Sequence, residues 1–193
     1  MKVSKQGVGK IAVEFISVVF AVLLALGLNH WRENKINEQL AADSYQRIQR
    51  EVQDNIAELD SSLIEFDRFI EEIKAEQSLL DSLGDNYKEV SWSYSHPVLS
   101  IDAWKAATIT NAVLNMDPDL VEDLADVYAV QEMYMEFGFK FFDRAAEMAR
   151  FRDDPETMIE IIQTHYAISK SIAKSLREGY GDFLEEYPLA ESE

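Results

Sequence analysis

The 193-residue chain contains no cysteine, so it has no disulfide bonds, no thiolate metal ligands and no cysteine nucleophile. It also holds only seven glycines and four prolines, the residues that most often interrupt helices. No internal repeat or low-complexity stretch is visible. This composition is typical of long, uninterrupted helices, and it predicts an all-α fold.

Enzyme motifs are also missing: there is no nucleophile elbow, phosphate-binding glycine loop or zinc motif. The closest glycine pairs, Gly7-Val8-Gly9 and Gly179-Tyr180-Gly181, lack a third glycine, so we interpret them as a hinge and a helix stop. The three histidines, His30, His96 and His165, lie far apart in the chain. We therefore predict a non-enzymatic protein with no catalytic residue, no metal and no cofactor.

Positive charge is scarce, with 18 Lys and Arg against 36 Asp and Glu and a formal net charge of −18. The charged residues before position 29 are Lys2, Lys5, Lys10 and Glu14. The remaining chain therefore holds 15 basic and 35 acidic residues. An acidic surface repels nucleic acid, and we expect no nucleic-acid partner. The charge is typical of a solvated domain, which we place at residues 32–187.

One long apolar run is present, from Ile11 to Leu28. Its length is close to the ~20 residues that cross a bilayer. We predict a transmembrane helix at residues 10–31, with Lys10, Trp31 and Arg32 at the membrane interfaces and the lipid bilayer as a partner. A cleaved secretory signal is the alternative, because Ala25-Leu26-Gly27 resembles a cleavage site. We favour a retained anchor, since the helical pattern continues through that site.

The orientation of this helix follows from the basic residues on its two sides. Lys2, Lys5 and Lys10 precede it, and Arg32, Lys35 and Arg47 follow it. Together with the terminal amine, this slight bias favours a cytoplasmic N-terminal tail at residues 1–9 and a domain outside the cytoplasm.

The small and polar residues of the apolar run share one side. At about 100° per residue they fall within roughly a third of the helix circumference. We name this set the docking stripe: Glu14, Ser17, Ala21, Ala25 and Asn29. Four-residue spacing of small side chains permits close approach of another membrane helix, the partner we expect. Glu14 either pairs with Lys10 near the headgroups or contacts a polar or basic group on the partner.

Helical periodicity continues beyond the membrane segment. Residues 29–83 lack proline and glycine, and apolar residues recur every seven positions at Tyr45, Val52, Leu59, Phe66, Ile73 and Leu80. Gly84-Asp85-Asn86 should end this helix. Residues 87–99 break the period and indicate an extended segment. Ser100 is the expected N-cap of a short helix, Ile101 to about Val113, with Trp104 and Ile109 facing inward.

Two Asp-Pro pairs, Asp117-Pro118 and Asp154-Pro155, predict the starts of two longer helices. The first should run to about Phe151 and the second to near Gly181. Their expected inner faces are Leu120, Leu124, Val127, Tyr128, Tyr134, Phe137 and Phe141, and Met158, Ile161, Ile162, His165, Ile168, Ile172 and Leu176. We therefore expect an antiparallel helical bundle with a flexible tail at residues 188–193.

Two groups of aromatic residues stand out. Trp92, Tyr94, Trp104, Tyr128 and Tyr134 either line a small-ligand pocket or partner surface, or cap the end of the bundle. Phe137, Phe139, Phe141 and Phe142 cover more than one face of a helix, which indicates either a partner surface or a deep core.

The first helix resembles a known family. Glu14-Phe15, Val18, the run Ala21-Val22-Leu23-Leu24-Ala25-Leu26, Asn29 and Trp31 resemble the opening signature of a widespread family of uncharacterised bacterial single-pass membrane proteins. The resemblance covers about twenty residues. It implies one membrane helix followed by an all-helical domain, and it implies no activity.

These patterns together favour a membrane-anchored accessory or scaffolding subunit of a homo-oligomeric or larger complex. Its expected location is the bacterial inner membrane, with the bulk of the chain in the periplasm. The alternative is an extracytoplasmic sensor whose helical bundle binds a small molecule and signals through a partner membrane protein.

Overall fold

The computed structural model describes residues 5–84, 96–148 and 154–188, and side chains in 14–84, 96–143 and 154–188. Every regular element in these ranges is helical, as the composition predicted. The elements are α1 (Lys5–Leu83), α2 (Asp102–Ile109), the 3-10 helix η2 (Ala112–Asn115), α3 (Pro118–Met148) and α4 (Pro155–Glu186).

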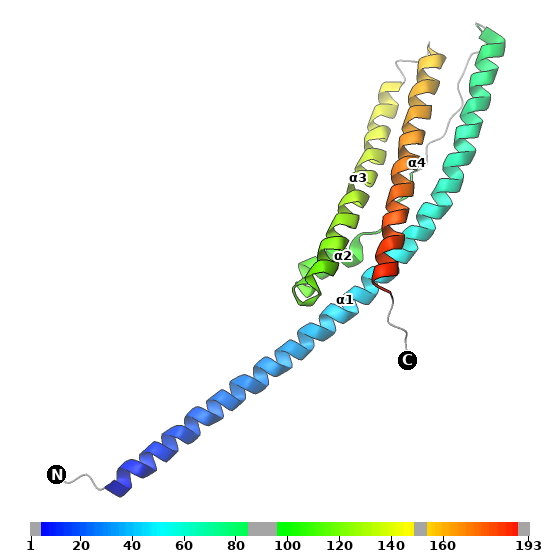
Figure 1. Ribbon diagram of the computed structural model, residues 1–193. Coiled ribbons are helices and arrows are strands. Elements are labelled where there is room, and N and C mark those ends of the chain that lie inside the picture. Colours follow the sequence, from blue (N-terminus) through cyan, green and yellow to red (C-terminus); the bar gives the residue numbers. More distant parts are fainter. Residues whose placement is uncertain (1–4, 85–95, 149–153, 189–193) are drawn as a thin grey trace.

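The apolar run and the heptad segment form a single helix, α1, of 79 residues. At 1.5 Å per residue this helix is about 120 Å long. It ends at Leu83, followed by Gly84 with φ +52°, a left-handed conformation that favours glycine. The predicted helix end at Gly84 is therefore confirmed. Figure 1 shows the N-terminal part of α1 projecting away from the other helices.

The C-terminal half of α1 packs against α4, α2 and η2, and α4 also packs against α3. In Figure 1, α3 runs in the same direction as the packed half of α1, whereas α4 runs opposite to both. The three long helices therefore lie side by side, with α4 antiparallel to each of its neighbours.

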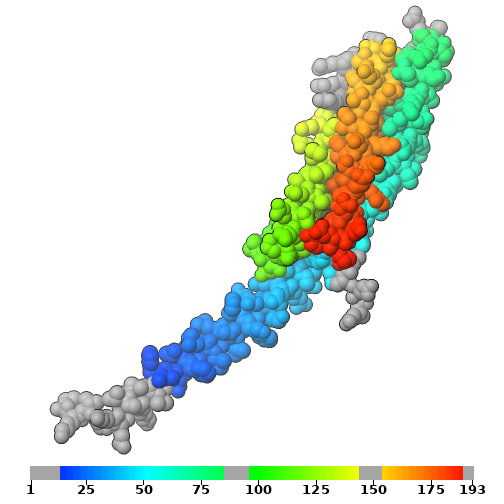
Figure 2. Space-filling model, viewed as in Figure 1, coloured from blue at the N-terminus to red at the C-terminus, as the bar shows by residue number. Residues whose placement is uncertain are grey.

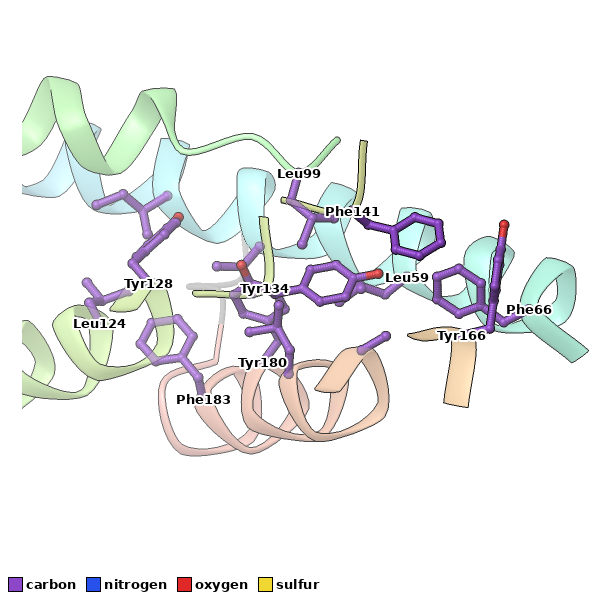
Figure 3. Packing of buried hydrophobic residues seen from close by; sticks show 14 of the residues in the cluster. Leu59, Phe66, Leu99, Leu124, Tyr128, Tyr134, Phe141, Tyr166, Tyr180 and Phe183 are labelled. Atoms are coloured by element: carbon purple, nitrogen blue, oxygen red, sulfur yellow. The ribbon is translucent and has the colours of Figure 1, made fainter. Parts of the chain in front are cut away.

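The core follows the predicted heptad of α1. Val52, Leu59, Phe66 and Ile73 are buried, and Tyr45 and Leu80 are partly buried against them. Figure 3 shows Leu59 and Phe66 beside aromatic side chains of the other helices. The ring of Tyr166 on α4 stacks on Phe69, with 4.1 Å between ring centroids.

Both predicted Asp-Pro helix starts are confirmed, since α3 begins at Pro118 and α4 at Pro155. The Asp154 side chain accepts a hydrogen bond from the Thr157 amide at 3.1 Å, as an N-cap does. The predicted end of α4 near Gly181 is wrong. The helix continues to Glu186, and buried Phe183 extends its inner face past the glycine.

Four other predictions are wrong. Ile109 and Ile168 point outward, with 80% and 43% of their surface exposed. The short helix ends at Ile109 because Asn111 adopts a left-handed conformation, φ 59°, and η2 follows this turn. Its N-cap position is Ile101, so Ser100 is not the cap. The predictions for Trp92, Tyr94, most of the extended segment 87–99, the end of α3 beyond Met148 and residues 189–193 lie outside the described residues.

Candidate functional site

The N-terminal part of α1 exposes a continuous apolar surface. Phe15 is 69% exposed and Leu23 61% exposed, and no described residue before Ala41 is buried. Figure 2 shows this part as a rod that no other element covers. By length and composition α1 can cross a membrane, and an N-terminal signal sequence meets the same criteria.

All five residues of the docking stripe lie on this rod, and all are exposed. Trp31, one of the predicted interface residues, is exposed at the end of the apolar segment, followed by exposed Arg32. The side chain of Lys10 lies outside the described residues.

A short stalk joins the rod to the packed helices. Residues 32–40 carry no buried side chain, and Ala41 is the first buried residue of α1. Nine helical residues span about 14 Å. Because the helix is continuous here, the stalk fixes the distance and the angle about the helix axis between the apolar segment and the packed helices in this structure.

A polar junction among the packed helices was not predicted from the sequence. Its centre is Glu51 of α1, which is only 7% exposed. The Glu51 carboxylate accepts hydrogen bonds from Ser100 Oγ at 2.6 Å, from the Ala103 amide at 2.8 Å and from the Tyr128 hydroxyl at 2.7 Å. Glu51 thus caps α2 from another helix, in place of the predicted Ser100 cap.

Asn55, one turn further along α1, forms hydrogen bonds with both the backbone carbonyl and the backbone amide of Ser100. Its Nδ2 donates to Ser100 O and its Oδ1 accepts from Ser100 N, each at 2.8 Å. Gln131 of α3 also donates to Ser100 O, and the Tyr180 hydroxyl of α4 donates to Gln131 Oε1. The polar junction, formed by Glu51, Asn55, Ser100, Tyr128, Gln131 and Tyr180, therefore joins α1, α3 and α4 to the segment before α2.

The surroundings of the junction favour the protonated form of both phenols. Burial, and then the hydrogen bond to Glu51, raise the pKa of Tyr128 far above its ordinary value. Burial also raises the pKa of Tyr180. A signal for the junction was present in the sequence, because Glu51 and Asn55 flank Val52 on the buried face of α1, where apolar residues are the norm.

The structure describes three of the five aromatic residues that were predicted to line a pocket or to cap the bundle. Trp104 stacks on Tyr128 with 5.5 Å between ring centroids, and Tyr134 lies against His96 at 4.5 Å. Tyr128 and Tyr134 are almost completely buried in the core, as Figure 3 shows. Trp92 and Tyr94 lie outside the described residues.

A hollow of about 350 Å³ lies between α3 and α4. Its apolar lining includes Phe137, Phe141 and Ile161, and Lys140 and Glu160 contribute charges. The imidazole of His165 stacks on Phe141 with 3.6 Å between centroids. Nearby on α3, Phe139 and Phe142 are exposed.

No cluster of three or more His, Asp and Glu side chains suited to a metal ion occurs among the described residues. In comparisons with models of protein families, with curated proteins and with solved structures, the chain matches none. The resemblance of the first helix to a family of single-pass membrane proteins therefore stays a prediction.

Proposed function

We propose that the protein is a non-enzymatic accessory or scaffolding subunit of a bacterial membrane complex. It is anchored by residues 10–31, and it docks to other membrane helices through the docking stripe. The N-terminal tail lies in the cytoplasm, and the packed helices form a bundle in the periplasm. The observation that supports this proposal most strongly is the continuity of α1 from the uncovered apolar rod into the buried core.

The physical argument rests on exposed surface. A fully exposed apolar rod of this length is unfavourable in water, whereas a bilayer covers it without any protein partner. Small residues give no advantage against lipid, but they let another helix approach closely and increase van der Waals contact. Ala21 and Ala25 therefore support helix docking rather than simple anchoring.

Docking is tested by replacing small side chains of the docking stripe with larger ones. Ala21→Leu with Ala25→Leu should strongly reduce recovery of the assembled complex, measured by crosslinking in native membranes and by native mass spectrometry. The matched control is Val19→Leu with Leu23→Phe, which enlarges the opposite side of the same helix. Equal assembly in both variants would contradict the docking role of the stripe.

The orientation of the chain in the membrane can be tested by labelling a single introduced cysteine, because the chain contains no other. A single Glu72→Cys variant, at an exposed position of α1, should react with a membrane-impermeant maleimide from the periplasmic side. Labelling only after the inner membrane is broken would place the bundle in the cytoplasm.

A second candidate function is ligand sensing, which the hollow between α3 and α4 favours. Its aromatic walls and charged Lys140 and Glu160 suit a small amphipathic molecule. A thermal-shift screen of the full chain in detergent tests this, with Ile161→Trp as a variant that fills the hollow. Stabilisation of the parent chain but not of Ile161→Trp by the same compound would support sensing.

A further inference from the structure

The packed helices cover only one side of α1. At about 100° per residue, buried Ile48, Val52 and Leu59 lie roughly 160–180° around the helix from the centre of the docking stripe. Figure 1 shows the other helices gathered along one side of α1. The docking stripe therefore continues, beyond the membrane segment, into the side of α1 that faces away from the bundle.

Contacts on both edges define this uncovered side. On one edge, Asp60 accepts from Arg177 Nε of α4 at 3.0 Å. On the other edge, Glu51 binds the start of α2. We name the exposed strip between these edges, from residue 32 to residue 58, the outer face: Arg32, Lys35, Ile36, Gln39, Leu40, Asp43, Gln46, Arg47, Arg50, Gln53, Asp54, Ala57 and Glu58.

The outer face differs in charge from the rest of the chain. It carries four basic residues (Arg32, Lys35, Arg47 and Arg50) and three acidic ones (Asp43, Asp54 and Glu58), whereas the whole chain has twice as many acidic as basic residues. Arg47 and Arg50 form no ion pair with any residue that the structure describes. Both line a hollow of about 430 Å³ between α1 and α2, together with Glu51, Asp54 and Asp102.

A second copy of the chain fits this surface poorly. Two copies inserted in a membrane run parallel, so a two-fold contact centred on this surface places each central residue opposite its own copy. Glu14 would meet Glu14 within the membrane segment, and Arg32 and Arg50 would each meet their own copies. Like charges at such short range are destabilising, most of all where water is excluded.

We propose that the helix docked on the stripe belongs to a different membrane protein, whose charges complement this pattern. That partner carries a polar or basic residue near the cytoplasmic end of its span. Above the opposite end it presents acidic residues to Arg47 and Arg50. The inference rests on the proposed docking function and specifies the chemistry of the partner.

The experiment uses the full chain in its native membranes. The photo-crosslinking residue benzoyl-phenylalanine replaces Gln46 on the outer face, Asn29 on the stripe, or Ser175, an exposed control position on α4. In parallel, a single Gln46→Cys variant reports self-association, because no other cysteine is present. Adducts are analysed by mass and by the sequence of the crosslinked peptide.

The proposal predicts adducts from Gln46 and Asn29, but not from Ser175, to one protein of different mass. The peptide crosslinked at Gln46 should hold an acidic segment next to a membrane helix. Arg47→Glu with Arg50→Glu should abolish the Gln46 adduct, whereas Lys74→Glu with Lys174→Glu, the same charge change elsewhere, should retain it.

Each contrary outcome points to a different error. A disulfide-linked dimer through Gln46→Cys, or an adduct that survives Arg47→Glu with Arg50→Glu, would overturn the charge-complementary partner and leave helix docking intact. Absence of adducts from both Gln46 and Asn29 would overturn the docking function itself.

Discussion

Glu51 of α1 accepts a hydrogen bond from the Tyr128 hydroxyl of α3 at 2.7 Å, although 77 positions separate the two residues. The same carboxylate caps the start of α2. One side chain thus connects α1, which carries the exposed apolar segment, to both α2 and α3. The junction therefore joins α2 and α3 to one level of α1.

The junction gives the first prediction. Tyr128→Phe should lower the free energy of unfolding by about 1–3 kcal/mol, because a buried carboxylate loses one of its donors. Glu51→Ala should lower the free energy of unfolding further than Tyr128→Phe does. The Tyr128 hydroxyl, Ser100 Oγ and the α2 amides would all lose their acceptor. Urea unfolding of the full chain in detergent, followed by circular dichroism, measures both variants.

Glu58→Ala is the matched control for Glu51, because Glu58 is an exposed glutamate on the same helix. Its effect should stay within about 0.5 kcal/mol. A Glu51→Ala variant as stable as Glu58→Ala would show that the junction contributes nothing to stability.

Gly138 of α3 gives the second prediction, because a Cβ there would overlap the His96 ring, whereas a Cβ at Gly179 of α4 meets no atom within 4 Å. Gly138→Ala should destabilise the fold by about 1–3 kcal/mol through overpacking. Gly179→Ala should stabilise it by about 0.5–1 kcal/mol, as alanine does within a helix. Thermal unfolding of both variants gives the comparison, and the same sign for both would contradict the close contact.

His96 makes stability depend on pH. Burial lowers the pKa of its imidazole to about 4, below its ordinary value of 6.5. The unfolded chain therefore takes up this proton first as pH falls, and the contribution of neutral His96 to stability, full above pH 6.5, is lost between pH 6.5 and 4. His96→Gln should be less sensitive than the parent chain over this range. Parallel unfolding curves at pH 7 and 4.5 test the difference, and an identical pH dependence would rule out a buried neutral imidazole.

The rotational coupling through the stalk gives a fourth prediction. Two alanines inserted after Asn34 rotate the bundle by about 200° relative to the docking stripe, whereas four rotate it by about 400°, close to a full turn. The Gln46 adduct should be lost with two alanines and partly recovered with four, while the Asn29 adduct persists in both. Equal Gln46 adducts in both variants would mean that α1 bends in the stalk.

Much of the fold follows from apolar spacing alone. The seven-residue repeat of α1 predicts the burial of Val52, Leu59, Phe66 and Ile73, because burial on one helix face leaves a periodic record in the sequence. The Asp-Pro pairs predict helix starts because proline needs no amide hydrogen bond at the first helical position. Such local rules need no knowledge of the neighbouring helices.

The polar junction is different because its partners are distant in sequence. Asn55 binds Ser100, 45 residues away, and Tyr128 lies 77 residues from Glu51. No spacing rule connects such pairs, so the sequence alone predicts that Ser100 caps the helix that follows it, whereas its hydroxyl donates to Glu51. Ile168 shows the converse error: its helical position matched the apolar face, but it lies at the margin of the contact and stays exposed.

Retention of the apolar N-terminal segment is the premise shared by the anchor, the docking stripe and the outer face. The most direct test is the intact mass of the protein extracted by detergent from membranes. We predict a chain that keeps the residues before Leu28 and remains in the membrane fraction after a high-salt wash. A mature chain that begins at about Leu28 and is released into the soluble fraction would contradict the account.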